Sequence, residues 1–148
     1  MPNDAMAIGL KFLTGRRLTV EELRQRMKRR GVESVECEEA LNRLIDLGLL
    51  DDRAYAHDMV ADALERGKHG PLGVRARLLR RGFAPDLISE MLKEGEDVWQ
   101  VIALRVAQEY DREDERDRVR LMRRLHREGF ASPIIQRTLN SADRHDSA

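Results

Sequence analysis

The sequence predicts an all-α protein in which three tandem three-helix repeats form an elongated, curved helical array. Aromatic residues are only 4% of the chain, whereas Leu, Ala, Arg and Glu are abundant, and this composition favours helices over sheets. A short motif also recurs three times, as RMKRRGV at 26–32, RLLRRGF at 77–83 and RLHREGF at 124–130. Its copies lie roughly 50 residues apart, a period typical of stacked helical units.

Each copy of the motif predicts the end of a helix. Apolar residues stand four and eight positions before the glycine in every copy, a spacing that places both on one helix face. The glycine then ends the helix as a left-handed residue, and the apolar residue after it can fold back on the last turn. The apolar pairs and their glycines are Leu23, Met27 and Gly31, then Val74, Leu78 and Gly82, then Leu121, Leu125 and Gly129.

The first repeat is expected over residues 1–50. A helix in AMAIGLKFL precedes the glycine-ended helix, which begins at TVEE with Thr19 as N-cap and Glu22 completing a capping box. After Gly31 we expect a longer link than in the other repeats, followed by a helix in ECEEALNRLIDLGLL.

The second repeat is expected over residues 51–95. Asp51 or Asp52 is the predicted N-cap of a helix in DDRAYAHDMVADALERG. Pro85 opens the helix that follows Gly82, a position that suits proline because its missing N–H has no partner there.

The third repeat is expected over residues 96–140. Its first helix is DVWQVIALRVAQEY, with Val98, Ile102 and Val106 along one side. Ser132 is the predicted N-cap of the last helix, with Pro133 at the first helical position. The segment 141–148 is predicted to be a flexible tail.

The formal net charge is zero, with 27 basic and 27 acidic residues, which argues against a general polyanion binder. The charges are nevertheless unevenly distributed. Each glycine-ended helix is basic, whereas acidic residues gather in segments such as VESVECEE and DREDE. A neutral chain can therefore present a basic side and an acidic side.

Patterns of catalysis are absent from the sequence. It holds no phosphate-binding glycine loop, and its four histidines lack the spacing of a zinc site. Asp51 and Asp52 are interpreted as helix caps, and Cys37, the only cysteine, as a small apolar residue of a protein in a reducing compartment. The sequence shows neither a membrane span nor a signal-peptide pattern. We therefore expect a cytoplasmic protein that is not an enzyme.

The basic residues of the second repeat are the candidate binding surface. Arg77 and Arg80 stand near a helix end, where cations complement the helix dipole, so a structural and a binding interpretation both stay open for them. Arg66, Lys68 and Arg75 are predicted to precede or open the helix, where the dipole disfavours cations, and they suggest an acidic partner. The predicted contact surface comprises Arg66, Lys68, Arg75, Arg77, Arg80 and Arg81, with Arg24, Arg26 and Arg29 of the first repeat as a second group.

Two long segments carry a resemblance to a known family. LNRLIDLGLLDDRAYAHDMV at 41–60 and GPLGVRARLLRRGF at 70–83 resemble the RecX regulatory proteins, and LTVEELRQRMKRRG and RRLHREGFASPIIQRTL are similar to the first and third units of that family. The resemblance implies tandem three-helix repeats that bind the RecA recombinase filament on DNA and inhibit its recombinase and ATPase activities. It also implies a monomer without a cofactor that binds DNA weakly when alone. Family members commonly carry an arginine in the helix after Tyr-Ala, where this chain has Ala61 and Ala63, and this departure shifts the expectation toward protein contact.

The alternative function is a helical DNA-binding module that acts without RecA. RLLRRGFAPDLISEML has the outline of a helix-turn-helix, but Asp86, Glu90 and Glu94 in its second helix are poor partners for DNA. The salt dependence of binding to bare DNA distinguishes the two functions.

Overall fold

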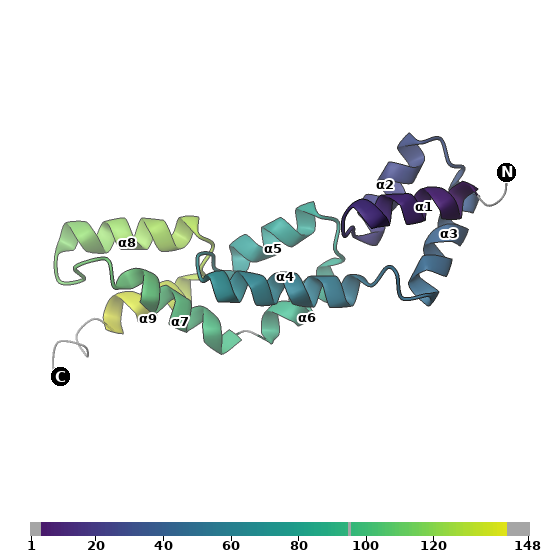
Figure 1. Cartoon of the computed structure of the whole chain (residues 1–148). Coiled ribbons are helices and arrows are strands. Elements are labelled where there is room, and N and C mark those ends of the chain that lie inside the picture. The colour runs from purple at the N-terminus through teal and green to yellow at the C-terminus, as the bar shows by residue number, and fades with distance from the viewer. Residues whose placement is uncertain (1–3, 95, 142–148) are drawn as a thin grey trace.

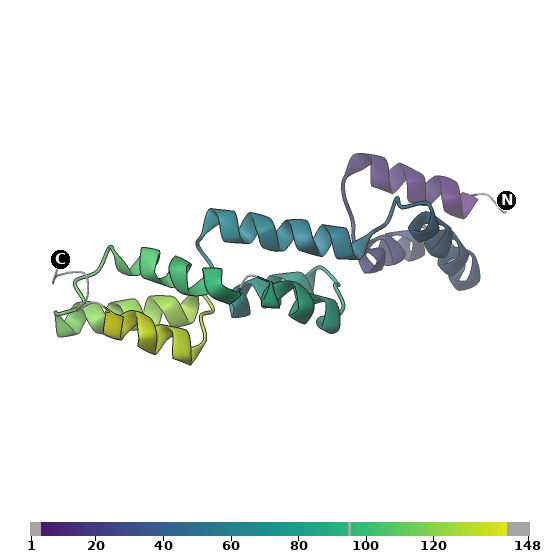
Figure 2. The same cartoon turned by 90° about the horizontal axis from the view of Figure 1, so that it is seen from below.

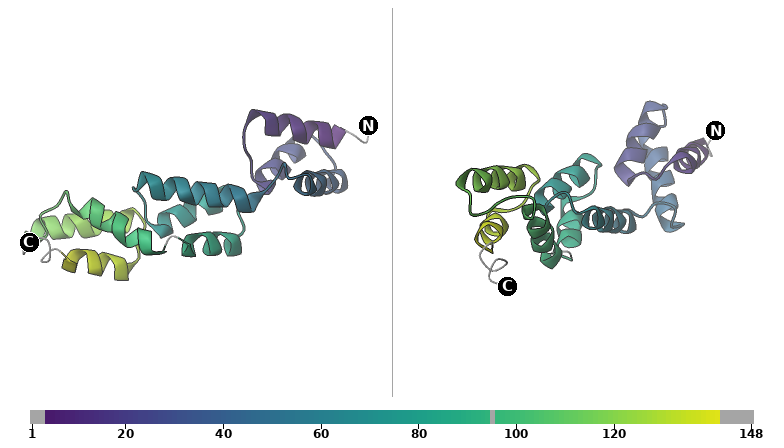
Figure 3. Two further views of the ribbon diagram at one scale, coloured as in Figure 1. Left: turned by 60° about the horizontal axis from the view of Figure 1, so that its bottom comes forward. Right: turned by 60° about the vertical axis from the view of Figure 1, so that its left-hand side comes forward.

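The computed structural model describes residues 4–94 and 96–141, and every regular element within them is a helix, which confirms the all-α class. The helices follow one another along an elongated array, with α1 near one end and α8 and α9 near the other (Figure 1). The elongated outline persists when the molecule is turned (Figure 2; left view of Figure 3). The helices are α1 (Asp4–Gly15), α2 (Val20–Arg29), α3 (Ser34–Asp46), α4 (Asp52–Arg66), α5 (Pro71–Arg80), α6 (Pro85–Lys93), α7 (Glu96–Ala107), α8 (Glu115–Arg127) and α9 (Ser132–Asn140).

The helices pack in consecutive threes. Helices α1, α2 and α3 contact one another, as do α4, α5 and α6, while α9 contacts both α7 and α8. The first three helices bury a core of their own, which contains Leu23, Met27 and Leu44. The other six share one continuous core, joined where α4 contacts α7. The division into repeats 1–50, 51–95 and 96–140 stays a prediction, and the predicted tail lies outside the described residues except for Ser141.

The three motif glycines end their helices as predicted. Gly31, Gly82 and Gly129 have φ of +84°, +91° and +90°. In each copy the N–H of the residue after the glycine donates to the carbonyl of the apolar residue five positions earlier, which is the pattern of a Schellman motif. These bonds are Val32 N to Met27 O at 3.1 Å, Phe83 N to Leu78 O at 3.3 Å and Phe130 N to Leu125 O at 3.0 Å.

Three local predictions are wrong. The link after Gly31 is no longer than the others, because α3 begins at Ser34, three residues past its glycine, as α6 and α9 do past theirs. The N-cap of α9 is Ala131, so Ser132 is the first helical residue. Val98 is 40% exposed, and Trp99 takes its place in the core of the third repeat, since burying the larger ring removes more apolar surface from water.

Other caps form as predicted. The side chain of Thr19 accepts from the Glu22 N–H, and the Glu22 carboxylate accepts from the Thr19 N–H, which completes the capping box. Asp51, rather than Asp52, caps α4 by accepting from the Ala54 N–H at 3.0 Å.

The glycine turn of α8 lies against the start of α5. The Gly70 N–H donates to the Glu128 carbonyl at 2.7 Å, and the Leu72 N–H donates to the Gly129 carbonyl at 2.8 Å. A Cβ on Gly129 would lie 2.1 Å from the Gly73 nitrogen, so only glycine permits this backbone approach. The N–H groups at the start of α5, which have no partner within their own helix, thus donate to carbonyls at the end of α8.

The glycine turn of α5 lies against the start of α2 in the same way. The Thr19 hydroxyl donates to the Arg81 carbonyl at 2.8 Å, and a Cβ on Gly82 would lie 2.8 Å from the Glu21 Cβ. Helices α8, α5 and α2 therefore succeed one another head to tail along the array (Figure 1). We call these two contacts the junctions.

We expect Gly129→Ala to destabilise the protein more than Gly31→Ala. Both replacements force a residue with a Cβ into the left-handed region, at a cost of about 1 kcal/mol. Among the described residues, a Cβ on Gly31 would have no neighbour within 4 Å, whereas one on Gly129 meets the Gly73 backbone, which adds about 1–3 kcal/mol of overpacking. Urea unfolding of the two variants measures the difference, and equal losses would mean that the α8–α5 junction does not form.

Candidate functional site

Four of the predicted contact residues line one groove between α4 and α5. Its volume is about 480 Å³, and its apolar floor consists of Met59, Ala63, Val74 and Leu78. Cationic side chains border this floor, and none of the described residues that line the groove is acidic. We call it the α4–α5 groove, and its cations are Arg66, Lys68, Arg77 and Arg80.

Arg77 and Arg80 are the two exposed arginines of α5 that border the groove. They lie three positions apart on α5, so both project from the same side of the helix. Within the described residues, neither guanidinium has a carboxylate oxygen within ion-pair distance. Their positive potential therefore reaches the solvent without an internal counter-charge.

The helix-end interpretation applies to Arg66 after all. Arg66 precedes the glycine-ended helix α5, as expected, but it also lies in the last turn of α4. That helix ends at Gly67 in the left-handed conformation, so the Arg66 cation complements the negative end of the α4 dipole. Its guanidinium also pairs with Asp62 one turn earlier, at 3.0 Å. The charge of Arg66 alone is consequently no sign of a partner, and the weight moves to Arg77 and Arg80.

Three other predicted residues are engaged inside the protein. Arg81 donates to both Glu22 oxygens at 2.8 and 3.1 Å and lies over the Tyr55 ring at 5.4 Å. Arg24 pairs with Glu38 at 2.8 Å and also with Glu21, while Arg75 donates to the Ser89 hydroxyl at 2.8 Å.

Arg81 joins the first and second repeats electrostatically. Burial acts to raise the pKa of Glu22, but hydrogen bonds from Arg81 and from the Thr19 backbone outweigh it and hold that pKa below its ordinary value. Hydrogen bonding to Glu22 in turn raises the pKa of Arg81. The pair is a bidentate contact across 59 positions of sequence, so Arg81 holds the α5–α2 junction.

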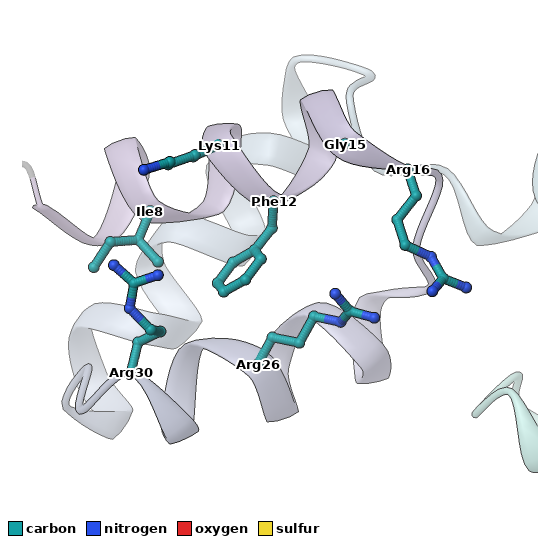
Figure 4. A pocket seen from close by; sticks show the side chains of 7 residues that line it. All are labelled: Ile8, Lys11, Phe12, Gly15, Arg16, Arg26 and Arg30. Carbon is teal, nitrogen blue, oxygen red and sulfur yellow. The ribbon is translucent and has the colours of Figure 1, made fainter.

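The second predicted group does not lie in the α4–α5 groove. Arg29 is exposed in the last turn of α2, where it suits the helix dipole. Arg26 lies over the Phe12 ring at 5.9 Å in a separate pocket between α1 and α2 (Figure 4). Lys11, Arg16 and Arg30 also line that pocket, and the sequence analysis did not single them out. The sequence signal for Arg16 and Arg30 is the excess of basic residues on both sides of the first glycine-ended helix.

Neither a metal site nor a membrane span appears in the described structure. Over residues 4–94 and 96–141, no three His, Cys, Asp or Glu side chains gather where they could hold a metal ion. No helix in these ranges is long and apolar enough to cross a membrane.

Family models match both the first and the second repeat. Residues 5–44 match a model described as "RecX, first three-helix domain", and residues 51–92 match "RecX, second three-helix domain". Together they cover more than half of the chain.

Curated relatives extend this similarity over most of the chain. The regulatory protein RecX of Trichlorobacter lovleyi is 31% identical over 144 residues, which cover 91% of this chain and 93% of that protein. RecX of Thermus thermophilus is 35% identical over 88% of this chain and 86% of its own length. RecX of Lacticaseibacillus paracasei is 29% identical over 93% of this chain, but the match spans only 60% of that longer protein.

Solved structures share the fold. The crystal structure of RecX from Lactobacillus salivarius superposes with a TM-score of 0.89 over 97% of both chains, at 19% sequence identity. A second RecX crystal structure gives 0.81 over 94% of this chain and 73% of its own.

We expect Glu22→Gln to destabilise the protein by about 1–2 kcal/mol near neutral pH, because the amide loses the charge that Arg81 contacts. A depressed folded pKa contributes stability that is present above the ordinary pKa of 4.5 and is lost as the pH falls through the folded value. The difference between the two proteins should therefore vanish in acid. Burial is the main cause that raises the pKa of Asp52, and this contribution is common to both proteins; the smaller contribution from the Glu22 charge is lost in the variant.

Urea unfolding between about pH 7 and about pH 3 measures this difference. A gap between native protein and variant that stays constant over the whole range would show that the ion pair contributes nothing.

Proposed function

The chain belongs to the RecX family, and from this premise we propose that it is a regulatory protein that binds the RecA filament on DNA and inhibits its recombinase and ATPase activities. In this role it modulates DNA repair in the cytoplasm as a binding protein, without a catalytic site or a cofactor. Its relatives are named regulatory proteins, which agrees with such a role.

The α4–α5 groove is the observation that carries the proposal. It combines an apolar floor with unneutralised Arg77 and Arg80, and such a surface suits an acidic protein partner better than a uniformly basic surface would. The net charge of the whole chain is zero, so the attraction is local to the groove.

The elongated array suits a filament as partner. Repeats placed in succession can contact successive protomers at once, and linked contacts that are each weak add up to useful affinity. A compact protein of the same size would reach fewer protomers.

DNA recognition without RecA has less support. In the helix after the Gly82 turn, Glu90 forms an ion pair with Arg53 at 2.7 Å, and Asp86 stands in the first turn. An acidic recognition helix is repelled by phosphates, so the helix-turn-helix outline does not favour major-groove binding.

We expect the double variant Arg77→Glu with Arg80→Glu to lose inhibition of the RecA ATPase on single-stranded DNA. Reversing both charges repels an acidic partner, so half-inhibition should need at least about tenfold more protein. A steady-state ATPase titration measures this shift.

Lys93→Glu with Arg116→Glu is the matched control, since it makes the same change in net charge at exposed positions that do not line the groove. Circular dichroism verifies that both variants fold. Unchanged inhibition by the groove variant would remove the α4–α5 groove from the contact surface. A native protein that binds bare DNA tightly with a steep salt slope, and does not inhibit RecA, would instead support the DNA-binding alternative.

A further inference from the structure

The pocket between α1 and α2 is the counterpart, in the first repeat, of the α4–α5 groove. Phe12 and Ala63 each stand nineteen positions before the glycine of their repeat, and Arg26 and Arg77 each stand five before it. Both pockets thus lie between the first helix of a repeat and its glycine-ended helix. We call the first-repeat site the α1–α2 pocket.

The α1–α2 pocket is the more sharply amphipathic of the two. Ile8 and Phe12 form its apolar part, in a cavity of about 300 Å³ (Figure 4). That volume is at the lower end for ligand pockets, so it fits one or two side chains rather than a whole protein surface. Figure 4 shows the Phe12 ring projecting from α1 into the space between the two helices.

Among the described residues, four cations and no acidic side chain border the pocket. Arg26 and Arg30 approach the Phe12 ring from two sides, at 5.9 and 5.8 Å, and Lys11 and Arg16 complete the border. Within the described part of the chain, none of the four has a carboxylate within ion-pair distance. Like charges that border one pocket repel one another, and an anion bound in that pocket relieves the repulsion.

The third repeat shows what a carboxylate does at the same place. Tyr110 stands nineteen positions before Gly129, as Phe12 does before Gly31, and Arg124 is the counterpart of Arg26. Arg124 donates to Glu109 at 2.8 Å and to the Tyr110 hydroxyl at 3.3 Å. In the first repeat, Lys11 stands where the third has Glu109, so the chain supplies no such carboxylate there.

We propose that the α1–α2 pocket binds an acidic peptide segment that carries a bulky apolar side chain. The apolar side chain packs against Phe12 and Ile8, and the carboxylates of the segment form ion pairs with Arg16, Arg26 and Arg30. The proposal goes beyond the proposed function, because it assigns a ligand chemistry to a second site, whichever protein carries the segment.

The apolar floors of the two pockets favour a peptide over a single-stranded nucleic acid. Single-stranded nucleic acids bind along successive aromatic platforms. Phe12 has no aromatic counterpart in the second repeat, where Ala63 and Met59 form an aliphatic floor. Aliphatic side chains of a peptide suit both floors, whereas stacked bases suit only one.

Fluorescence anisotropy with the full-length chain tests the proposal without RecA. The probe is a labelled polyglutamate peptide with a central leucine pair, and the comparison peptide has alanines in place of the leucines. We expect saturable binding of the leucine peptide and about tenfold weaker binding of the alanine peptide, because leucine buries more apolar surface. Arg16→Glu and Arg30→Glu, both at exposed positions, should each weaken binding about fivefold to tenfold.

Arg116→Glu serves as the control, since it reverses one exposed charge in α8 and should leave binding unchanged. Equal binding of the two peptides, or equal binding to native protein and Arg30→Glu, would overturn the proposal. So would tighter binding of labelled oligothymidylate that both pocket variants abolish, since the pocket would then bind nucleic acid. Because no RecA is present, a failure of RecA inhibition leaves this result untouched, and the converse also holds.

Discussion

Head-to-tail contact between glycine-ended helices is the interaction on which the rest of this structure depends. At the α8–α5 junction, backbone N–H groups at the start of α5 donate to carbonyls at the end of α8, including Leu72 to Gly129 at 2.8 Å. At the α5–α2 junction, side chains take over this role, with the Thr19 hydroxyl on the Arg81 carbonyl and Arg81 on Glu22. Both junctions pair the negative end of one helix dipole with the positive end of the next. Because the same turn is used each time, the repeats are placed in succession along one direction.

This succession decides where the grooves lie. Each lies between the first helix and the glycine-ended helix of its repeat, so repeating the junction repeats the groove. The three repeats differ in the charge at one equivalent position, which holds Lys11, Asp62 and Glu109. Glu109 neutralises Arg124 of the third repeat, whereas Asp62 pairs with Arg66 and leaves Arg77 without a counter-charge among the described residues. The first two repeats therefore present two basic pockets, and two linked sites can bind an extended partner more tightly than either alone.

Local chemistry was largely predictable from the sequence, whereas the grouping of charges was not. A glycine stop, a capping box and an i, i+4 apolar pair are each determined by residues within one helix turn or two, and the predictions for Gly82, Thr19 and Leu78 are confirmed. Whether an arginine forms an internal ion pair or faces the solvent depends on which carboxylates the fold brings near it. Arg81 meets Glu22 across 59 positions and Arg24 meets Glu38 across 14, so two predicted surface contacts are internal. Arg66 was misinterpreted for a different reason, because its charge was compared with the dipole of the helix that follows it and not with that of α4, whose last turn contains it.

Although the net charge of the chain is zero, its carboxylates are unevenly distributed among its arginines. Glu22 neutralises Arg81 at part-buried positions, where an unpaired charge would be costly, and Glu38 neutralises the half-buried Arg24 from an exposed position. Neither Glu22 nor Glu38 lines the α4–α5 groove or the α1–α2 pocket. Arg77, Arg80 and Arg26 therefore have no counter-charge among the described residues. A uniformly basic protein would attract every polyanion, whereas cations set around an apolar floor favour a ligand that is both anionic and apolar. The contact of Glu109 with Arg124 beside the Tyr110 ring is an internal example of that chemistry, and an acidic partner would supply the same carboxylate to the two basic pockets.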